Sequence, residues 1–184
     1  MRLLPLLLAL ALTACVPGFP PARPAPRPVF DPIAFFSGQT RGEGRLSIVF
    51  RSPSRFAVDG SGRIAPDGSV ILDQRIHRLG RTPQRRQWRI ARIGPGRYAA
   101  SLSSADGPVS AAVDGNLLRL DFREKGLAVH QEIVLDADGR SARNRMTLSK
   151  LGIPIAAVEE TILRLEPARY RDWKGWRPGS ATGP

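Results

Sequence analysis

The stretch DGPVSAAVDGNLLRLDF (residues 106–122) carries the pattern that decides the fold. Apolar side chains occupy every second position in two runs, namely Val109, Ala111 and Val113, then Leu118, Leu120 and Phe122. Such alternation is typical of a β-strand with one buried face. Between the runs, Asp114-Gly115-Asn116 supplies residue types that adopt the positive φ angles of a tight hairpin. The stretch therefore predicts two antiparallel strands joined by a short turn.

The same alternation recurs between about residue 42 and residue 165, with turns rich in Gly, Asp and Asn between the runs. The spacing indicates roughly nine or ten strands, and helical periodicity is nearly absent. A meander of this length has to close or stack, because open edges aggregate, and near-uniform hairpin spacing favours closure. We therefore predict an all-β fold: an antiparallel up-and-down meander closing into a lipocalin-like barrel of about 8–10 strands.

The first residues predict export and lipid attachment. One cation precedes a leucine-rich run from Leu3 to Leu12, which at about 10 residues is too short to span a bilayer as a helix. Leu12-Thr13-Ala14-Cys15 resembles the lipobox of bacterial lipoproteins, whose cysteine receives a diacylglyceryl group. Two or three acyl chains on Cys15, the single cysteine, would anchor the protein stably. We predict a lipoprotein signal peptide over residues 1–14 and lipidation of Cys15.

Composition divides the remaining chain into three parts. Residues 15–32 hold the acylated cysteine and a linker that contains seven of the 17 prolines. Because proline fixes its own φ and donates no backbone hydrogen bond, we expect this linker to be a semi-extended tether that holds the folded body off a membrane. Residues 33–167 form the predicted barrel domain, and residues 168–184 form a basic, aromatic tail.

The chain is strongly basic. Lys and Arg number 28 against 16 Asp and Glu, which gives a formal net charge of +12 at pH 7. Such a charge is typical of proteins that meet nucleic acid or an anionic surface. Export excludes nucleic acid, so the expected partners are the membrane, through the acyl chains, and anionic lipid headgroups. We expect the periplasmic face of the outer membrane, because Val16 and not Asp follows the cysteine.

Short motifs recur in a fixed order over most of residues 33–165. They include Phe35-Phe36-Ser37-Gly38, Gly42, Gly44, Arg55-Phe56, Arg86-Gln87-Trp88-Arg89-Ile90, Gly96-Arg97-Tyr98, Gly115-Asn116 and Asn144-Arg145-Met146. In this order they resemble the motifs of an uncharacterised proteobacterial lipoprotein family, domain of unknown function 3833. The resemblance implies a lipocalin-like fold and a place in the cell envelope. The family has no established activity, and its neighbourhood of lipid-modifying genes implies a connection with lipid.

The sequence offers little for catalysis. The two histidines, His77 and His130, lie far apart in the chain, and acylation consumes Cys15. His and Cys are too few for the usual structural zinc sites, and no glycine-rich phosphate loop leads from a strand into a helix. We therefore predict that the protein is not an enzyme and uses no metal or cofactor. His77 is expected to face outward from a strand.

The predicted lumen contains the candidate ligand-binding residues. Arginine pairs well with carboxylate and phosphate, and eight Arg with no Asp or Glu fall between Arg75 and Arg97. We predict lumen contacts at Trp88, Tyr98 and Phe122, with Arg86 and Arg89 as rim partners of a negative headgroup. Two alternatives stay open, because the inward-facing residues either leave room for a small ligand or fill the lumen.

The C-terminal tail interleaves aromatic and cationic residues, which are typical of membrane–water interfaces. Its candidate membrane-surface residues are Tyr170, Trp173, Lys174, Trp176 and Arg177. In the alternative, Trp173 and Trp176 pack across one end of the barrel.

Two functions fit these patterns. The leading hypothesis is a membrane-anchored periplasmic lipoprotein whose barrel binds or carries a lipid, fatty-acid or other apolar ligand. The alternative is a non-enzymatic structural or assembly factor of the cell envelope, whose filled barrel presents a surface.

Overall fold

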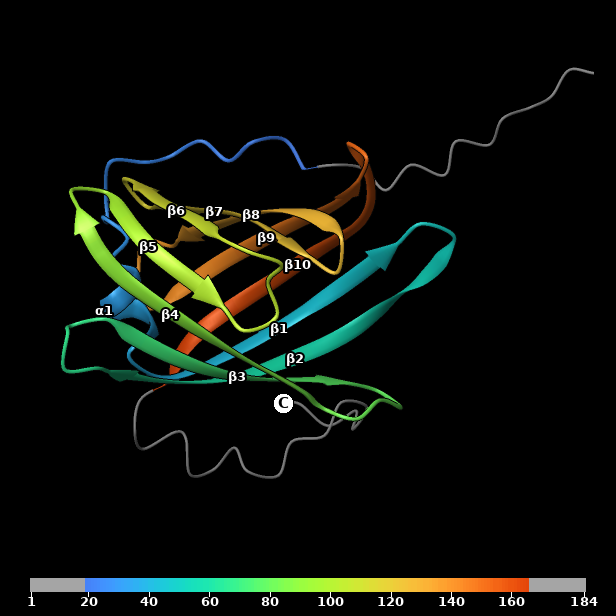
Figure 1. Ribbon diagram of the computed structural model, residues 1–184, viewed down its shortest axis with the longest axis horizontal. Coiled ribbons are helices and arrows are strands. Elements are labelled where there is room, and N and C mark those ends of the chain that lie inside the picture. The colour runs from blue at the N-terminus through green and yellow to red at the C-terminus, as the bar shows by residue number, and fades with distance from the viewer. Residues whose placement is uncertain (1–18, 166–184) are drawn as a thin grey trace, which may run out of the picture.

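Ten antiparallel strands close into a barrel in this computed structural model, which describes residues 19–165 (Figure 1). Each strand pairs with its neighbours in the sequence, and β1 closes the barrel by pairing with β10. The strands are β1 (Gly38–Ile48), β2 (Arg51–Ile64), β3 (Val70–Arg78), β4 (Gln84–Gly94), β5 (Arg97–Leu102), β6 (Val109–Asp114), β7 (Leu117–Glu124), β8 (Leu127–Leu135), β9 (Ser141–Lys150) and β10 (Ile153–Leu165). The predicted all-β, up-and-down, closed meander is confirmed.

The two ends of the barrel differ. Because the strands alternate in direction, the turns β1–β2, β3–β4, β5–β6, β7–β8 and β9–β10 lie at one end, which we call the mouth. The other turns lie at the opposite end with the short helix α1 (Pro32–Phe36), and we call this end the base (Figure 1, left). Successive side chains of a strand point alternately into the lumen and outward. Lumen-facing partners include Leu72 opposite Trp88 and Asn144 opposite Glu160.

Helix α1 closes the base. The side chain of Asp31 caps it by accepting hydrogen bonds from Ile33 N and Ala34 N at 3.0 and 3.2 Å, a typical N-cap. The helix and the residue before the cap bury three aromatic rings with centroids 5.0–6.2 Å apart, those of Phe30, Phe35 and Phe36. These rings fill the base of the lumen. Within residues 19–165, no helix has the length and apolar character needed to cross a membrane.

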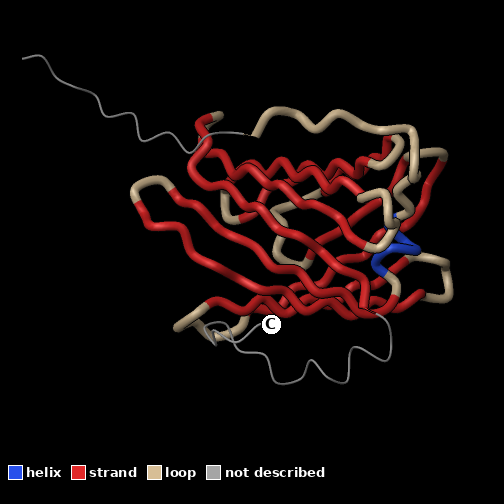
Figure 2. The backbone as a smooth tube through the Cα atoms, turned by 180° about the vertical axis from the view of Figure 1, so that it is seen from behind, coloured by secondary structure: helices blue, strands red, loops and turns tan. Residues whose placement is uncertain are grey.

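The described part of the linker, residues 19–31, lies along the outside of the barrel (blue in Figure 1, the long tan segment in Figure 2). Phe30 N donates to Gly115 O at 2.8 Å, and Asn116 N donates to Ala25 O at 2.9 Å. Farther toward the N-terminus, Ala22 N donates to Glu132 Oε2 at 2.8 Å. The expected free-standing tether is therefore wrong for these residues. The residues between the prolines keep backbone N–H and C=O groups, and the barrel binds them.

Candidate functional site

A belt of five polar side chains crosses the lumen at mid-height, on β3, β4, β8, β9 and β10: Gln74, Arg86, Gln131, Asn144 and Glu160. On one side, Arg86 Nε donates to Gln74 Oε1 at 2.7 Å. On the other side, Gln131 Nε2 donates to Asn144 Oδ1 at 3.0 Å, and Asn144 Nδ2 donates to Glu160 Oε2 at 2.7 Å. This polar belt places one cation and one acid inside the barrel.

Glycine on β1 makes room for the acid of the polar belt. Gly42 lies beside Glu160, and a Cβ built on Gly42 would overlap Glu160 Oε1 and lie 2.8 Å from its Cδ. Gly44 pairs directly with Glu160 across the β1–β10 contact. The carboxyl group therefore fits into the lumen because β1 has no side chain at this level.

Burial perturbs both ionisable groups of the polar belt. Loss of water lowers the pKa of the Arg86 guanidinium, and the negative charge of Glu160 opposes this shift. Burial raises the pKa of the Glu160 carboxyl, against the hydrogen bond from Asn144 and the positive charge of Arg86. Gln131 Oε1 is buried and accepts no hydrogen bond. The belt therefore contains polar groups whose bonding capacity the barrel does not use up.

Above the polar belt, the lumen opens into a cavity of about 500 Å³, which we call the mouth cavity. Apolar side chains form its walls: Leu46, Phe56, Val58, Ile76, Leu127, Met146, Leu148 and Val158. Arg86 and Glu160 contribute to its floor, and Arg78, Gln84, Arg85, Glu124 and Lys125 surround its opening. Its volume lies in the range of about 300–1,000 Å³ that is typical of small-molecule sites.

Below the polar belt, the lumen is nearly solid. The remaining void of about 20 Å³ is lined by Phe36, Leu72, Trp88 and other core residues, and has room for about one water molecule. Trp88 and Phe122 pack edge to face with ring centroids 5.6 Å apart. The sequence left open whether the inward-facing residues fill the lumen or leave room for a small ligand. The structure shows a filled lumen toward the base and an open one toward the mouth.

The structure separates the predicted ligand-binding residues. Arg86 lies in the floor of the mouth cavity, below the rim where it was expected. Trp88, Tyr98 and Phe122 face the lumen as predicted, but they belong to the packed half, and none lines the mouth cavity. The predicted rim position of Arg89 is wrong. Arg89 lies three positions after Arg86 and therefore faces the opposite side of β4. Its Nη2 binds Asp67 Oδ2 at 2.6 Å on the outside of the barrel.

Other predicted residues lie outside the described part of the chain. They are the lipidation residue Cys15 and the membrane-surface residues Tyr170, Trp173, Lys174, Trp176 and Arg177. Their roles stay predictions.

Sequence reasoning missed four members of the polar belt. A signal for them existed, because each occupies an inward position between two apolar inward residues. Gln131 lies between Val129 and Ile133, and Glu160 lies between Val158 and Ile162. A polar residue that interrupts the buried face of a strand is a useful marker of a lumen site.

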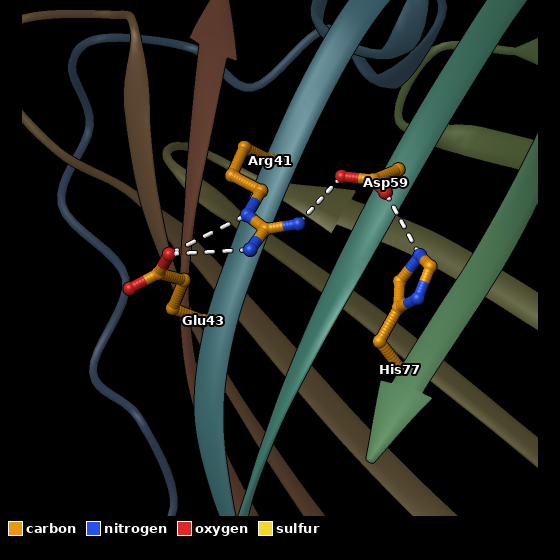
Figure 3. Close-up of polar contacts among 4 residues, drawn as sticks. All are labelled: Arg41, Glu43, Asp59 and His77. Atoms are coloured by element: carbon orange, nitrogen blue, oxygen red, sulfur yellow. Dashed lines mark hydrogen bonds and ion pairs between the residues drawn. The ribbon is translucent and has the colours of Figure 1, made fainter. Parts of the chain in front are cut away.

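A second hollow, of about 770 Å³, lies against β1–β4 and is lined mainly by side chains of their outer face. Figure 3 shows its central contacts: Asp59 accepts from Arg41 Nη1 at 2.6 Å and contacts His77 Nε2 at 2.9 Å. His77 therefore faces outward, as predicted. Among the described residues, no hydroxyl group forms a hydrogen bond with His77, so this Asp–His pair lacks the nucleophile of a catalytic triad. The mouth cavity is the stronger candidate for an apolar ligand.

Comparison with known proteins agrees with the fold. The family model described as "Protein of unknown function (DUF3833)" matches residues 9–164. No curated protein matches the sequence.

Three solved structures share the barrel. The S-type phycobiliprotein lyase CPES from Guillardia theta has a TM-score of 0.58 and 7 % identity, over 73 % of this chain and 90 % of that one. A protein of unknown function from the DUF3598 family of Nostoc punctiforme PCC 73102 has a TM-score of 0.56 and 12 % sequence identity, and the match covers 76 % of this chain and 51 % of that one. Rv2717c from M. tuberculosis has a TM-score of 0.53 and 13 % sequence identity, and the match covers 74 % of this chain and 99 % of that one. At such identities the likeness shows a common lipocalin-like fold and no more.

Proposed function

The chain belongs to the DUF3833 family of proteins of unknown function, and we propose that its mouth cavity binds or carries an acyl-type apolar ligand with an anionic head. We further propose that the protein works as a lipoprotein of the cell envelope, anchored through acyl chains on Cys15. The observation that supports this proposal is one cavity of about 500 Å³ that combines apolar walls with a floor formed by Arg86 and Glu160. Burial raises the pKa of the Glu160 carboxyl and so favours its neutral form, which leaves Arg86 as the cation of the floor.

Arg86 supports the anionic head. A guanidinium group has five N–H donors, and Nε already donates to Gln74. For the two terminal nitrogens of Arg86, no hydrogen bond to a described residue is found, although the group lies deep in the barrel. A carboxylate or phosphate on the floor of the cavity would accept from these nitrogens in the bidentate geometry that arginine favours.

The distribution of polarity favours a ligand with its head on the floor and its chain toward the mouth. The walls between floor and opening are apolar, and each methylene buried against them contributes about 0.8 kcal/mol. In the reverse orientation, the methyl end of the chain would cover Arg86 and Glu160 and remove their remaining access to water. That burial is costly for the Arg86 guanidinium, because its two terminal nitrogens have no hydrogen-bond partner among the described residues.

Ligand binding tests this proposal directly. The full chain is titrated with a dansyl-labelled undecanoic acid, followed by displacement with palmitate. Val158→Trp places a large ring in the wall of the mouth cavity, and Ala112→Trp adds the same ring to the exposed outer face of β6 as a control. We expect saturable binding by the wild type, at least about tenfold weaker binding by V158W, and no change in A112W. Absence of wild-type binding, or equal binding by V158W, would refute the proposal.

Anchoring has its own test. Mass spectrometry of the protein from bacterial membranes should find the diacylglyceryl group on Cys15, and Cys15→Ser should release the protein from those membranes. A protein that stays bound without this thiol would exclude the lipid anchor and leave the ligand-binding proposal standing.

One observation favours the alternative function, a non-enzymatic structural or assembly factor of the envelope. Within residues 19–165, the base half of the lumen is packed by aromatic rings, and the void found there measures about 20 Å³. A stable protein partner recovered from membranes, together with an inert mouth cavity, would favour this alternative. That the protein is not an enzyme stays a prediction.

A further inference from the structure

Three of the five mouth turns present large apolar side chains to solvent. Phe50 in the β1–β2 turn is 85 % exposed, Leu79 in the β3–β4 turn 77 %, and Leu151 in the β9–β10 turn 95 %. Ile153, at the start of β10, is 67 % exposed. We call these four residues the apolar tips. In Figure 1 these turns lie at the end opposite α1. The other exposed large apolar residues of the described chain, Val29, Ile64, Ile93 and Leu163, lie near the base and are 46–62 % exposed, so the four most exposed ones are at the mouth. A group of strongly exposed apolar side chains marks a candidate interaction surface.

Backbone conformation makes two of the apolar tips unusual. Phe50 and Leu151 have φ angles of +59° and +49°, in the left-handed region that Gly and Asn adopt most easily. The four turns at the base fill such positions with glycine alone, at Gly68, Gly96, Gly115 and Gly139. The mouth turns also contain glycines with positive φ, but they add three other residues in this region, Phe50, Lys125 and Leu151. Folding alone would favour Gly or Asn at the mouth as well. The mouth therefore keeps bulky apolar residues at a cost in stability, which points to a role outside folding.

The apolar tips lie in regions of the chain without acidic residues. No Asp or Glu occurs between Gly44 and Val58, between Gln74 and Ala105, or between Gly139 and Val158. Exposed cations adjoin the tips and the β7–β8 turn: Arg51, Arg81, Lys125 and Lys150. Among the described residues none of these four has an ion-pair partner, and the acids in or beside the mouth turns are Asp106 and Glu124. The mouth is thus both apolar and cationic.

This combination matches an anionic lipid bilayer, and we propose that the mouth of the barrel docks on one. The apolar tips insert among the headgroups, and the four cations contact lipid phosphates. A protein partner with an acidic, apolar surface would match less well, since the four tips are spread over three hairpins and line no groove. The proposal goes beyond ligand binding, because docking needs no ligand in the lumen.

The rest of the fold agrees with this orientation. The mouth cavity opens at the same end as the tips, so a docked barrel would exchange an acyl ligand with the bilayer without passage through water. Residues 19–31 run from Gly115 and Asn116 at the base toward Arg145 on β9, whose guanidinium lies over the ring of Phe19. Cys15 precedes Phe19 by four residues, which span at most about 14 Å. The path of the chain therefore allows the anchor and the mouth to meet the same membrane.

Vesicle binding by matched variants tests the proposal. The chain from residue 15 onward carries Cys15→Ser, so that neither an acyl group nor the apolar run Leu3–Leu12 contributes. Its co-sedimentation with vesicles of phosphatidylcholine, with or without phosphatidylglycerol, is measured. The test variant is Phe50→Asn with Leu151→Asn, which removes two apolar tips and installs a residue suited to positive φ. The matched control is Ile64→Asn with Ile93→Asn, two exposed apolar residues near the base turns.

We expect the wild type to bind the anionic vesicles, and less so at high salt. F50N/L151N should bind about tenfold more weakly or worse, with a melting temperature equal to or above that of the wild type. I64N/I93N should bind like the wild type. Wild-type protein that ignores anionic vesicles, unchanged binding by F50N/L151N, or capture of a protein by the mouth in place of lipid would overturn the proposal.

Titration with the dansyl-labelled acid in vesicle-free buffer separates docking from ligand binding. F50N/L151N should bind this probe like the wild type, because neither residue lines the mouth cavity. If vesicle binding fails while the titration succeeds, the docking proposal alone falls.

Discussion

Replacing Gly42 by Ala should destabilise the barrel through a residue on another strand, Glu160. The added methyl group would overlap Glu160 Oε1 and lie 2.8 Å from Glu160 Cδ, closer than Cβ atoms approach other groups in proteins. The carboxyl group therefore has to leave its position. In doing so it gives up the hydrogen bond of 2.7 Å from Asn144 Nδ2.

The magnitude follows from two opposing contributions. A buried polar group left without its partner costs about 1–3 kcal/mol. Ala in place of Gly in a strand returns about 0.5–1 kcal/mol, because glycine loses more backbone entropy on folding. The net loss in the free energy of unfolding should be about 0–2.5 kcal/mol relative to the wild type, which lowers the melting temperature by up to roughly 10 °C for a domain of this size. Relative to a glycine-to-alanine change without the clash, the loss should be about 1–3 kcal/mol.

Urea and thermal unfolding followed by circular dichroism measure this loss. Gly94→Ala is the matched control, because a Cβ at Gly94 would meet no atom within 4 Å. It should be neutral or slightly stabilising. The double variant with Glu160→Ala completes a mutant cycle, and the cost of Gly42→Ala should largely vanish in that background because the obstructing carboxyl is gone.

Two results would refute the reasoning. If G42A is as stable as G94A, Glu160 does not occupy the lumen beside β1. If the cost of G42A persists in the Glu160→Ala background, the methyl group acts through some other contact. The first result would remove the acid from the floor of the mouth cavity, and the second would remove Glu160 as the cause of the lost stability.

Three further predictions follow from the same contacts. Arg86→Gln should weaken binding of the dansyl-labelled acid by about tenfold or more, because a charge-assisted hydrogen bond is lost. Binding of a dansyl-labelled alcohol of equal length should be unaffected, and Arg85→Gln, at the cavity opening, is the control. Burial raises the pKa of Glu160 above its ordinary 4.5, so the folded protein keeps a proton that the unfolded chain releases. The free energy of unfolding should therefore decrease as pH rises above about 4.5. Urea titrations of Glu160→Gln at the same pH values should lack this decrease. Asn116→Ala removes the side-chain hydrogen bonds to Ala25 N and Leu135 O. It should lower the free energy of unfolding in urea by about 1–3 kcal/mol and speed proteolysis of residues 19–31. Proteolysis of these residues at the wild-type rate would show that other contacts hold the linker.

The alternation of residues 106–122 determined two strands and their turn, and its repetition determined an up-and-down barrel. These are local properties, because burial of every second side chain and a positive φ in the turn depend on residues near one another in the chain. Observation agrees for β6, β7 and Gly115, whose φ is +54°.

The site depended on pairings that the sequence does not display. Gln74, Gln131 and Glu160 each interrupt an apolar alternation, and they form a single belt only because β10 closes on β1 in one register. The same closure decides which half of the lumen is filled, since α1 brings Phe35 and Phe36 to the base. Trp88, Tyr98 and Phe122 were correctly expected to face inward, but their level in the barrel is a tertiary property.

For the linker too, its local conformation followed from the sequence, and its position on the barrel followed from the fold. Its prolines determined from sequence alone that residues 19–31 form no regular strand or helix. Asn116, which lies 91 residues after Ala25 and binds it at 2.7 Å, determined that the segment lies on the barrel. Secondary structure in this protein thus follows from local sequence, whereas the cavity, the polar belt and the docked linker follow from contacts between residues far apart in the chain, which come together only once the barrel has closed.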